Sequence, residues 1–273
     1  MKKAFLVGVN DYKPAGAGGP DLSGCVNDVK DMANTLVICG FEPRQMRLCT
    51  DRSATRENIM RGLNALVVNA RPGDSLVFYY SGHGSQVADT SGDEVDQSDE
   101  ILCPHDIDFG RQVFITDDDL RGVFAALPAG VNLEVILDSC HSGTATRDGR
   151  KIRSRYLAPP VDQSFHIDYE PRLARHRLLR PGNSRKDALV TQGLGHTLWA
   201  ACKDNQTSEE TEFKGVVRGV FTYHFCKVLR RTSGVIARQK LERLVTAALK
   251  RDGFEQVPQL ETPKEELLDQ PFL

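Results

Sequence analysis

Two apolar runs of the sequence end in polar clusters whose residue types could do chemistry. The run LVFYY (76–80) leads into SGHGSQ, and the run LEVIL (133–137) leads into DSCHSG. In an open α/β sheet, reactive groups gather in the loops at the carboxyl ends of the strands. If these two strands are neighbours, His83 and Cys140 leave the sheet at the same edge and can meet there.

A cysteine and a histidine that meet in this way form a nucleophile and its base. A thiol is only a few per cent thiolate near neutral pH, and an adjacent imidazole activates it by accepting the proton. The N–H groups of Gly84 and Cys140 can point at one oxygen and form an oxyanion hole. The pattern therefore predicts acyl transfer, although a cysteine at a strand end is by itself more often a packed residue. His141 directly follows Cys140, but the side chains of consecutive residues point in different directions. We therefore expect His141 to have a packing or hydrogen-bonding role and not to be the base.

The rest of the chain predicts the elements that would hold this pair. Buried or β-prone runs predict strands at residues 3–10, 45–49, 74–80, 133–137 and 196–203. Apolar residues at helical spacing, with Gly or Pro stops, predict helices at residues 26–37, 55–67, 119–127, 221–229 and 238–251. This alternation predicts an α/β fold with a mostly parallel central sheet and helices on both faces.

Composition excludes several other classes of protein. The 273 residues are 40% hydrophobic and 26% charged, as in an ordinary globular protein, and the net charge of −2 favours neither nucleic acid nor a membrane surface as partner. The first apolar run is too short to span a membrane and lacks a cleavage site, so we expect a soluble, cytoplasmic protein. The seven cysteines form no CxxC pair, so we expect neither a disulfide framework nor a zinc finger.

Two segments of opposite charge are hidden by the nearly neutral total. Residues 89–119 contain eleven Asp or Glu and one basic residue, and a hard cation such as calcium would relieve their repulsion, although a solvated acidic loop is the commoner case. Residues 145–187 contain nine Arg and two Lys against five acids, with little apolar pattern. We expect a mobile basic loop, which could instead bind anions or nucleic acid.

The motifs resemble those of metacaspases, within the wider clan of caspase-like peptidases. SGHGSQ, SDEILCPHDI, ITDDDL, DSCHSG and QVPQLE (256–261) occur in the expected order, and DSC replaces the QAC segment typical of true caspases. The resemblance implies a caspase-like three-layer sandwich in a single peptidase domain over residues 1–273. In it, His83 is the general base or acid and Cys140 the thiolate nucleophile. Because the first strand begins at residue 3, we expect a type I-like catalytic domain without an N-terminal extension.

The resemblance also implies a substrate class. Ser81 and Asp138 each lie two residues before a member of the dyad, and metacaspases build their specificity pocket from these positions together with an Asp of the first helix region. In this chain that residue is Asp28, beside Cys25. Buried carboxylates suit a long cationic side chain, so we expect cleavage of polypeptides after Arg or Lys.

Three further expectations concern regulation. Calcium activation is common among similar metacaspases, and the matching ligands are Asp99, Asp117 and Asp118, with Asp148 as the candidate for a fourth. We expect the basic loop to cover the site and to be cut by the protein itself, because it offers Arg147, Arg150, Arg153, Arg155, Arg172, Arg175 and Arg177 to an enzyme that prefers Arg. We expect a monomer and no organic cofactor.

Two other functions stay open. A catalytically silent binding module could keep the caspase-like sheet without turnover. Another cysteine endopeptidase of the same clan could share the dyad but prefer Asp or Asn. Hydrolysis of matched peptides ending in Arg, Lys, Asp or Asn, with calcium or chelator, separates these functions.

Overall fold

The fold is built on one six-stranded sheet. The computed structural model describes residues 1–12, 21–88, 98–141, 152–160, 196–203 and 206–273. In sheet order the strands are β12 (Gln259–Glu261), β9 (His196–Ala200), β7 (Asn132–Asp138), β3 (Ser75–Ser81), β1 (Lys2–Gly8) and β2 (Met46–Thr50). Every neighbouring pair is parallel except β12 with β9. The predicted mostly parallel α/β sheet is confirmed.

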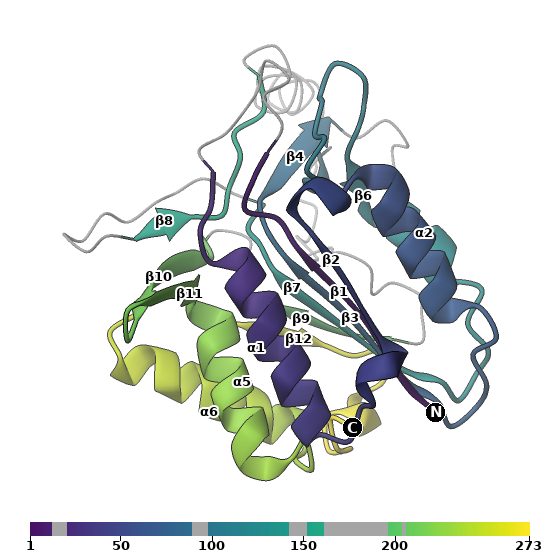
Figure 1. Ribbon diagram of the computed structural model, residues 1–273. Helices are drawn as coiled ribbons and strands as arrows, with labels where there is room; N and C mark the ends of the chain where they lie inside the picture. Colours follow the sequence, from purple (N-terminus) through teal and green to yellow (C-terminus); the bar gives the residue numbers. More distant parts are fainter. Residues whose placement is uncertain (13–20, 89–97, 142–151, 161–195, 204–205) are drawn as a thin grey trace, which may run out of the picture.

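Helices cover both faces of this sheet (Figure 1). On one face lie α1 (Cys25–Ile38), α5 (Val220–Thr232) and α6 (Arg238–Arg251); on the other lie α2 (Arg56–Val67) and α3 (Asp117–Phe124). The core is correspondingly divided into two apolar clusters, one on each side of the strands. The central strands are buried on both faces, which explains why they read as continuous apolar runs. This is the three-layer arrangement that the resemblance implied.

Two small antiparallel sheets stand at the carboxyl edge, and the sequence did not predict them. One contains β4 (Gly84–Ala88), β5 (Ser98–Leu102) and β6 (Ile115–Thr116); the other contains β8 (Arg153–Ser154), β10 (Glu209–Phe213) and β11 (Val216–Gly219). Short 3-10 turns occur at Pro43–Gln45, Asp51–Ser53 and Glu265–Leu267. The strands of the two small sheets have two to five residues each, too few to show a clear period in the sequence.

Some element boundaries differ from those predicted. The helix expected at residues 119–127 begins at Asp117, because the Thr116 side chain accepts from the Asp119 N–H and Asp119 in turn accepts from the Thr116 N–H. The strand expected at 196–203 ends at Ala200, and the helix expected at 221–229 runs to Thr232. The described part of the expected basic loop is not simply a loop, because it contains β8 and the fully buried Arg155.

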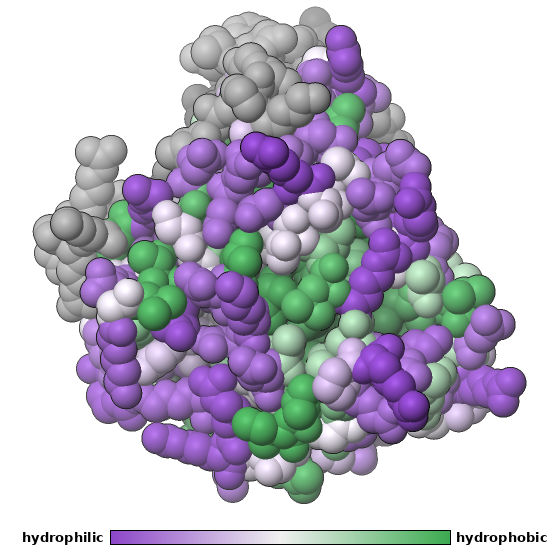
Figure 2. Space-filling model, in the orientation of Figure 1, coloured by the Kyte–Doolittle hydropathy of each residue, from purple (hydrophilic) through white to green (hydrophobic). Residues whose placement is uncertain are grey.

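Apolar side chains are exposed along one edge of the central sheet. Figure 2 shows apolar side chains between α1 and α2, where the sheet ends at β2; Val37, Ile38 and Leu48 are exposed there. Among the described residues, no helix is both long enough and apolar enough to cross a bilayer. All seven cysteines lie in described segments, and each is a free, buried thiol.

Candidate active site

The two polar clusters meet at one edge of the sheet. Strands β3 and β7 pair in parallel, with Ser81 opposite Asp138. His83 and Cys140 each follow two residues beyond this pair, and the Gly82 N–H donates to the Asp138 carbonyl oxygen at 3.3 Å. The sheet register therefore brings the His and Cys segments side by side.

The His83 backbone is fixed from several sides. Its N–H donates to Tyr12 Oη at 2.6 Å, and its carbonyl oxygen accepts from Tyr80 Oη at 2.7 Å and from the Cys103 N–H at 3.0 Å. Burial raises the pKa of both Tyr12 and Tyr80, so both phenols stay protonated and neutral at physiological pH. The Tyr12 ring lies 4.8 Å from the His83 ring. The backbone of His83 is thus held by two neutral phenols, and its ring lies beside that of Tyr12.

Cys140 is buried, and its sulfur contacts the segment that leads into β10. The Ser208 N–H points at Cys140 Sγ at 2.8 Å, and Sγ lies 3.3 Å from the Ser208 carbonyl oxygen. An N–H directed at sulfur is a contact that favours a thiolate. Ser208 is therefore positioned to influence the nucleophilic form of Cys140.

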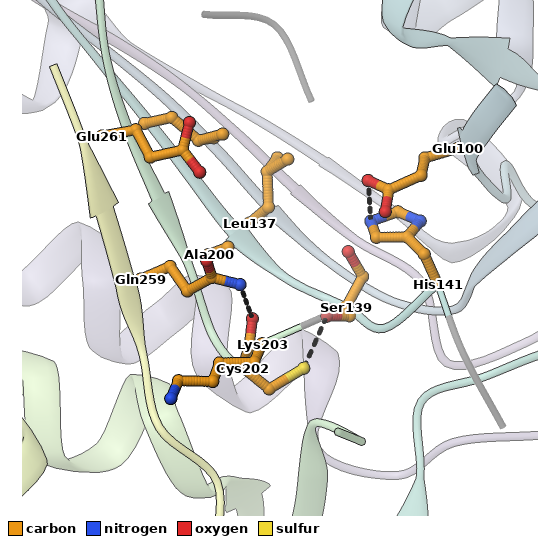
Figure 3. Close-up of a pocket in the computed structure, with 10 residues that line it drawn as sticks. Glu100, Leu137, Ser139, His141, Ala200, Cys202, Lys203, Gln259 and Glu261 are labelled. Carbon is orange, nitrogen blue, oxygen red and sulfur yellow. Dashed lines mark hydrogen bonds and ion pairs between the residues drawn. The ribbon is translucent and has the colours of Figure 1, made fainter. Parts of the chain in front are cut away.

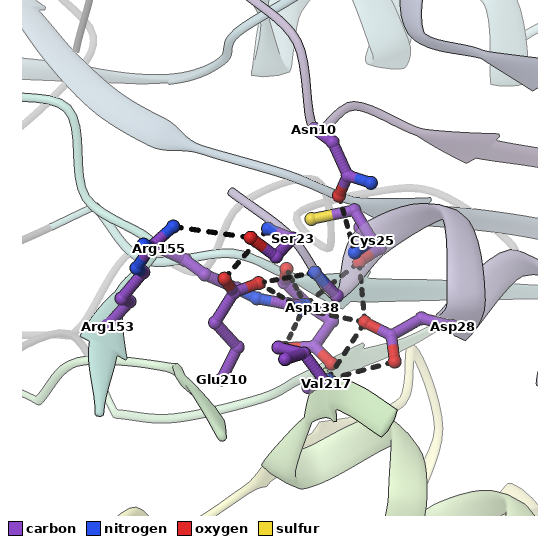
Figure 4. A network of polar contacts seen from close by, with 12 residues as sticks. Asn10, Ser23, Cys25, Asp28, Asp138, Arg153, Arg155, Glu210 and Val217 are labelled. Atoms are coloured by element: carbon purple, nitrogen blue, oxygen red, sulfur yellow. Dashed lines mark hydrogen bonds and ion pairs between the residues drawn. The ribbon is translucent and has the colours of Figure 1, made fainter. Parts of the chain in front are cut away.

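The guanidinium of Arg155 fills a pocket of carboxylates (Figure 4). Its Nη2 lies 2.6 Å from Asp28 Oδ2 and 3.5 Å from Glu210 Oε2. Its Nη1 lies 3.0 Å from Asp138 Oδ1 and donates to Ser81 Oγ at 2.9 Å. All five side chains are buried. We call the cavity around this guanidinium, lined by Asp28, Ser81, Asp138 and Glu210, the acidic pocket.

The backbone of Arg155 lies against both the Gly84 and the Cys140 segments. Its carbonyl oxygen accepts from the Gly84 N–H at 3.0 Å and from the Cys140 N–H at 3.4 Å. Its own N–H donates to the Ser208 carbonyl oxygen at 3.0 Å, which continues the antiparallel pairing of β8 with β10. The two N–H groups that the sequence suggested as an oxyanion hole thus converge on the carbonyl of the Arg155–Tyr156 peptide bond.

The residues that the sequence grouped as a specificity pocket do lie together. Ser81 Oγ donates to Asp28 Oδ2 at 3.0 Å, and Asp28 also accepts from the Gly219 N–H. Asp138 is held by Ser208 Oγ and Thr222 Oγ1, each at 2.5 Å.

Cys25 lies at the same pocket as a neutral thiol. Burial raises its pKa well above the ordinary value, against the effect of the nearby Arg155. Its backbone N–H donates to Asn10 Oδ1 at 2.8 Å, which holds the start of α1.

Sequence reasoning missed Glu210 and could not single out Arg155. Glu210 also accepts from the N–H groups of Ser23 and Gly24, which ties β10 to the start of α1. The alternation of side chains along β10 would have turned Glu210 inward, but that strand was not predicted. Arg155 is one of many arginines in its segment, and only the folded chain distinguishes it.

A small pocket lies beside Cys140 (Figure 3). Its lining includes Ser139, His141, Cys202, Glu100 and Glu261. His141 Nδ1 lies 3.4 Å from the Ser85 carbonyl oxygen, and its Nε2 lies 3.8 Å from Glu100, which agrees with a hydrogen-bonding role. A hydrogen bond with Cys140 and, as a smaller effect, burial raise the pKa of Cys202 well above the ordinary value. Cys202 is therefore a neutral thiol.

The proposed calcium ligands are only partly described. Asp117 and Asp118 share the guanidinium of Arg121, at 2.8 and 2.9 Å, and Asp148 lies outside the described residues. Burial raises the pKa of Asp117, against the effect of Arg121. Within the described segments no three acidic, histidine or cysteine side chains, Asp99 included, gather as a metal site. These residues alone therefore do not complete a calcium cage.

The family comparison decides what kind of protein carries this site. A family model for the metacaspase peptidase C14 domain matches residues 2–147. The chain belongs to the metacaspase family. It is therefore a cysteine-type endopeptidase domain. Metacaspase-1 of Scheffersomyces stipitis is 35% identical over 84% of the chain, which spans 62% of that relative's length. Metacaspase-1A of Aspergillus oryzae is 30% identical over the whole chain, which spans 70% of its length.

Solved structures agree with this metacaspase fold. A Geobacter sulfurreducens protein superposes with a TM-score of 0.70 at 26% identity, over 99% of this chain and 97% of its own. Caspase-1 of Spodoptera frugiperda superposes with a TM-score of 0.60 at 13% identity, over 96% and 86%. Because only 13% of the residues are identical, the similarity to the Spodoptera caspase-1 shows the fold alone.

Proposed function

We propose that this metacaspase domain cleaves peptide bonds after Arg or Lys, with Cys140 as nucleophile and His83 as acid and base. The observation that carries the proposal is Arg155, whose side chain fills the acidic pocket while its carbonyl oxygen accepts from Gly84 and Cys140. This is the arrangement that a bound substrate would adopt. It makes the Arg155–Tyr156 bond of the chain itself the first substrate.

The chemistry proceeds in two balanced steps. His83 accepts the proton of the Cys140 thiol, the thiolate adds to the Arg155 carbonyl carbon, and the resulting oxyanion is stabilised by the N–H groups of Gly84 and Cys140. His83 then gives a proton to the Tyr156 nitrogen as the C–N bond breaks, which leaves a thioester on Cys140. Water, deprotonated by His83, attacks the thioester, releases a carboxylate at Arg155 and restores the thiol–imidazole pair.

The acidic pocket favours Arg over Lys, and both over Asp or Asn. Two guanidinium nitrogens engage three carboxylates and one hydroxyl, whereas an ammonium group offers a single nitrogen. An acidic side chain in the same place would meet only like charge. These contacts support a preference for Arg and argue against an enzyme specific for Asp or Asn.

Self-cleavage is tested on the full chain by gel electrophoresis and mass spectrometry. We expect the wild type to yield a fragment that begins at Tyr156, Arg155→Lys to yield it more slowly, and Arg155→Gln and Cys140→Ala to yield none. Arg153→Gln is the matched control, because Arg153 is exposed and should leave the cut intact. Nicking of Cys140→Ala at the wild-type rate would falsify the proposal.

Turnover of external peptides separates the peptidase from a silent binding module. The processed protein should hydrolyse fluorogenic peptides ending in Arg at least tenfold faster than matched Asn or Asp peptides, because the latter lose the charged hydrogen bonds. No turnover of any peptide would support the binding module instead.

We also propose calcium as activator, with Asp117 and Asp118 among its ligands. Their carboxylates already attract one cationic group, Arg121, which calcium would have to displace. Arg121→Ala should therefore lower the calcium concentration for half-maximal self-cleavage, and Asp118→Asn should raise it. Identical curves for wild type and both variants would remove these residues from the calcium site.

We propose that the domain acts as a monomer. The sheet ends beyond β9 at β12, a three-residue antiparallel strand that carries Glu261. A short, charged edge strand disfavours pairing with a second sheet. Light scattering at micromolar concentration should report the mass of one chain; a dimer mass would contradict this.

A further inference from the structure

The segment after the Arg155–Tyr156 bond lies in a second, apolar site. Residues 155, 157 and 159 are buried and Ala158 is exposed, which is the alternation of an extended chain. Leu157 is 4% exposed and belongs to the apolar cluster on the α2 side of the sheet, as does Val87 of β4. The polypeptide is thus anchored on both sides of the bond, by a cation before it and by an apolar side chain after it.

Gly84 sets the register between these two anchors. Its N–H donates to the Arg155 carbonyl oxygen at 3.0 Å, and its own carbonyl oxygen accepts from the Leu157 N–H at 2.9 Å. Gly84 therefore forms a parallel bridge centred on Tyr156. A peptide whose carbonyl occupies the same hole must present its second residue after the bond where Leu157 lies.

The backbone at Gly84 has no room to change this register. A Cβ atom at this position would lie 2.3 Å from the Cys140 carbonyl oxygen and 2.9 Å from His141 Cε1. The strand that forms one wall of the oxyanion hole is thus packed directly on the nucleophile segment. The same residue both stabilises the oxyanion and aligns the polypeptide after the bond.

We propose that the site selects an apolar residue at the second position after the cleaved bond, in addition to the cation before it. The inference depends on the endopeptidase function proposed above and extends its substrate class. An apolar side chain at the place of Leu157 leaves water on binding, whereas a carboxylate there would lose its hydration without a partner. The intervening Tyr156 is half-exposed, so the position directly after the bond is not selected in this way.

The test uses synthetic peptides, so that no variant of the enzyme has to fold. The parent is an internally quenched peptide with the sequence of residues 151–160, KIRSRYLAPP. Relative to this parent, Leu157→Asp should lower kcat/KM by at least tenfold, and Leu157→Ala should lower it less. Ala158→Asp is the matched control at the exposed neighbouring position and should change kcat/KM by less than about twofold.

An Arg peptide with a fluorophore directly after the bond is measured in parallel, since it reports the dyad and the acidic pocket alone. Cleavage of neither the fluorophore substrate nor the parent would overturn the proposed function. Cleavage of the fluorophore substrate would leave that function standing, and the inference would then fail on any of three results: an uncut parent, equal rates for parent and Leu157→Asp, or an equal loss from Ala158→Asp.

Discussion

At the scale of single residues, the acidic pocket balances charge among fully buried side chains. Burial by itself would lower the pKa of Arg155, but Asp138 and the other acidic neighbours raise it, so the guanidinium stays charged. Asp28 shows the opposite balance, because burial raises its pKa to about 6 although Arg155 lowers it. Without a cation in the pocket, the pKa of Asp28 would be higher still.

This balance predicts a pH dependence of substrate binding. With the cation in place the pKa of Asp28 is about 6, and without the cation it is higher, so the empty pocket loses this charge at a higher pH than the occupied one. We therefore expect KM for Arg peptides to rise about tenfold as the pH falls from 8 to 6 and to level off below that. Steady-state kinetics should show a flat KM over this range for Asp28→Asn, at a value above that of the wild type. A wild-type KM that is constant as the pH falls from 8 to 6 would contradict the prediction.

At the scale of elements, the site depends on how closely the helices approach the strands. Gly62 lies in the middle of α2, where glycine disfavours a helix. A Cβ atom there would lie 2.2 Å from Phe5 Cζ, in the ring that α2 packs upon in β1. Glycine is required at position 62 because α2 packs too closely on Phe5 of β1 to leave room for a larger side chain. Gly122 in α3, by contrast, has open space where a Cβ would be.

The two glycines therefore predict opposite effects of the same substitution. Gly62→Ala should lower the free energy of unfolding by about 1–3 kcal/mol, because the Phe5 ring must move. Gly122→Ala should raise it by about 0.5–1 kcal/mol, because alanine favours a helix. Urea denaturation of both variants in the Cys140→Ala background measures the pair without self-cleavage. A loss for Gly122→Ala as large as that for Gly62→Ala would contradict this explanation.

At the scale of the whole molecule, the active site joins segments that are far apart in the chain. Asp28 follows the first strand, Ser81 and Asp138 end two others, and Glu210 lies in a strand of a separate small sheet. Arg155 contacts all four, so the intact chain occupies its own acidic pocket. We therefore expect external peptides to be cut only after this segment leaves.

The fold as a whole should also be sensitive to acid through His196. Its ring lies between β9 and Phe124 of α3, and neither nitrogen has a hydrogen-bond partner within the described part of the chain. Burial lowers its pKa from 6.5 to about 4, so the unfolded chain binds a proton at this position before the folded one does. Stability should be complete above pH 6.5 and fall between pH 6.5 and 4, by roughly 3 kcal/mol at most from this group.

Chemical denaturation of Cys140→Ala at pH 7 and pH 5 measures this loss. Adding His196→Leu should reduce the difference between the two pH values, since the ionisable group is gone. His224, whose pKa burial also lowers to about 4, should supply part of the remaining loss. An unchanged difference in the His196→Leu protein would show that this group does not contribute.

Local patterns in the sequence were enough to predict five of the six strands of the central sheet, the helices on both of its faces, and the two strand ends that carry His83 and Cys140, but not β12. These signals are local, because a buried strand and an amphipathic helix each have their own period and the polar clusters directly follow them. Family motifs added Asp28 and Cys25, which no local pattern distinguishes from ordinary residues of a first helix.

The choice of Arg155 among the arginines of its segment, and the presence of Glu210 in the acidic pocket, follow from tertiary contacts alone. Both depend on short strands, β8 and β10, that pair across more than fifty residues of sequence. Such pairing is stabilised by hydrogen bonds and burial between distant segments. A periodic pattern within either segment therefore cannot predict the pairing. For the same reason, the apolar site of Leu157 becomes visible only where Gly84 fixes the register of the folded chain.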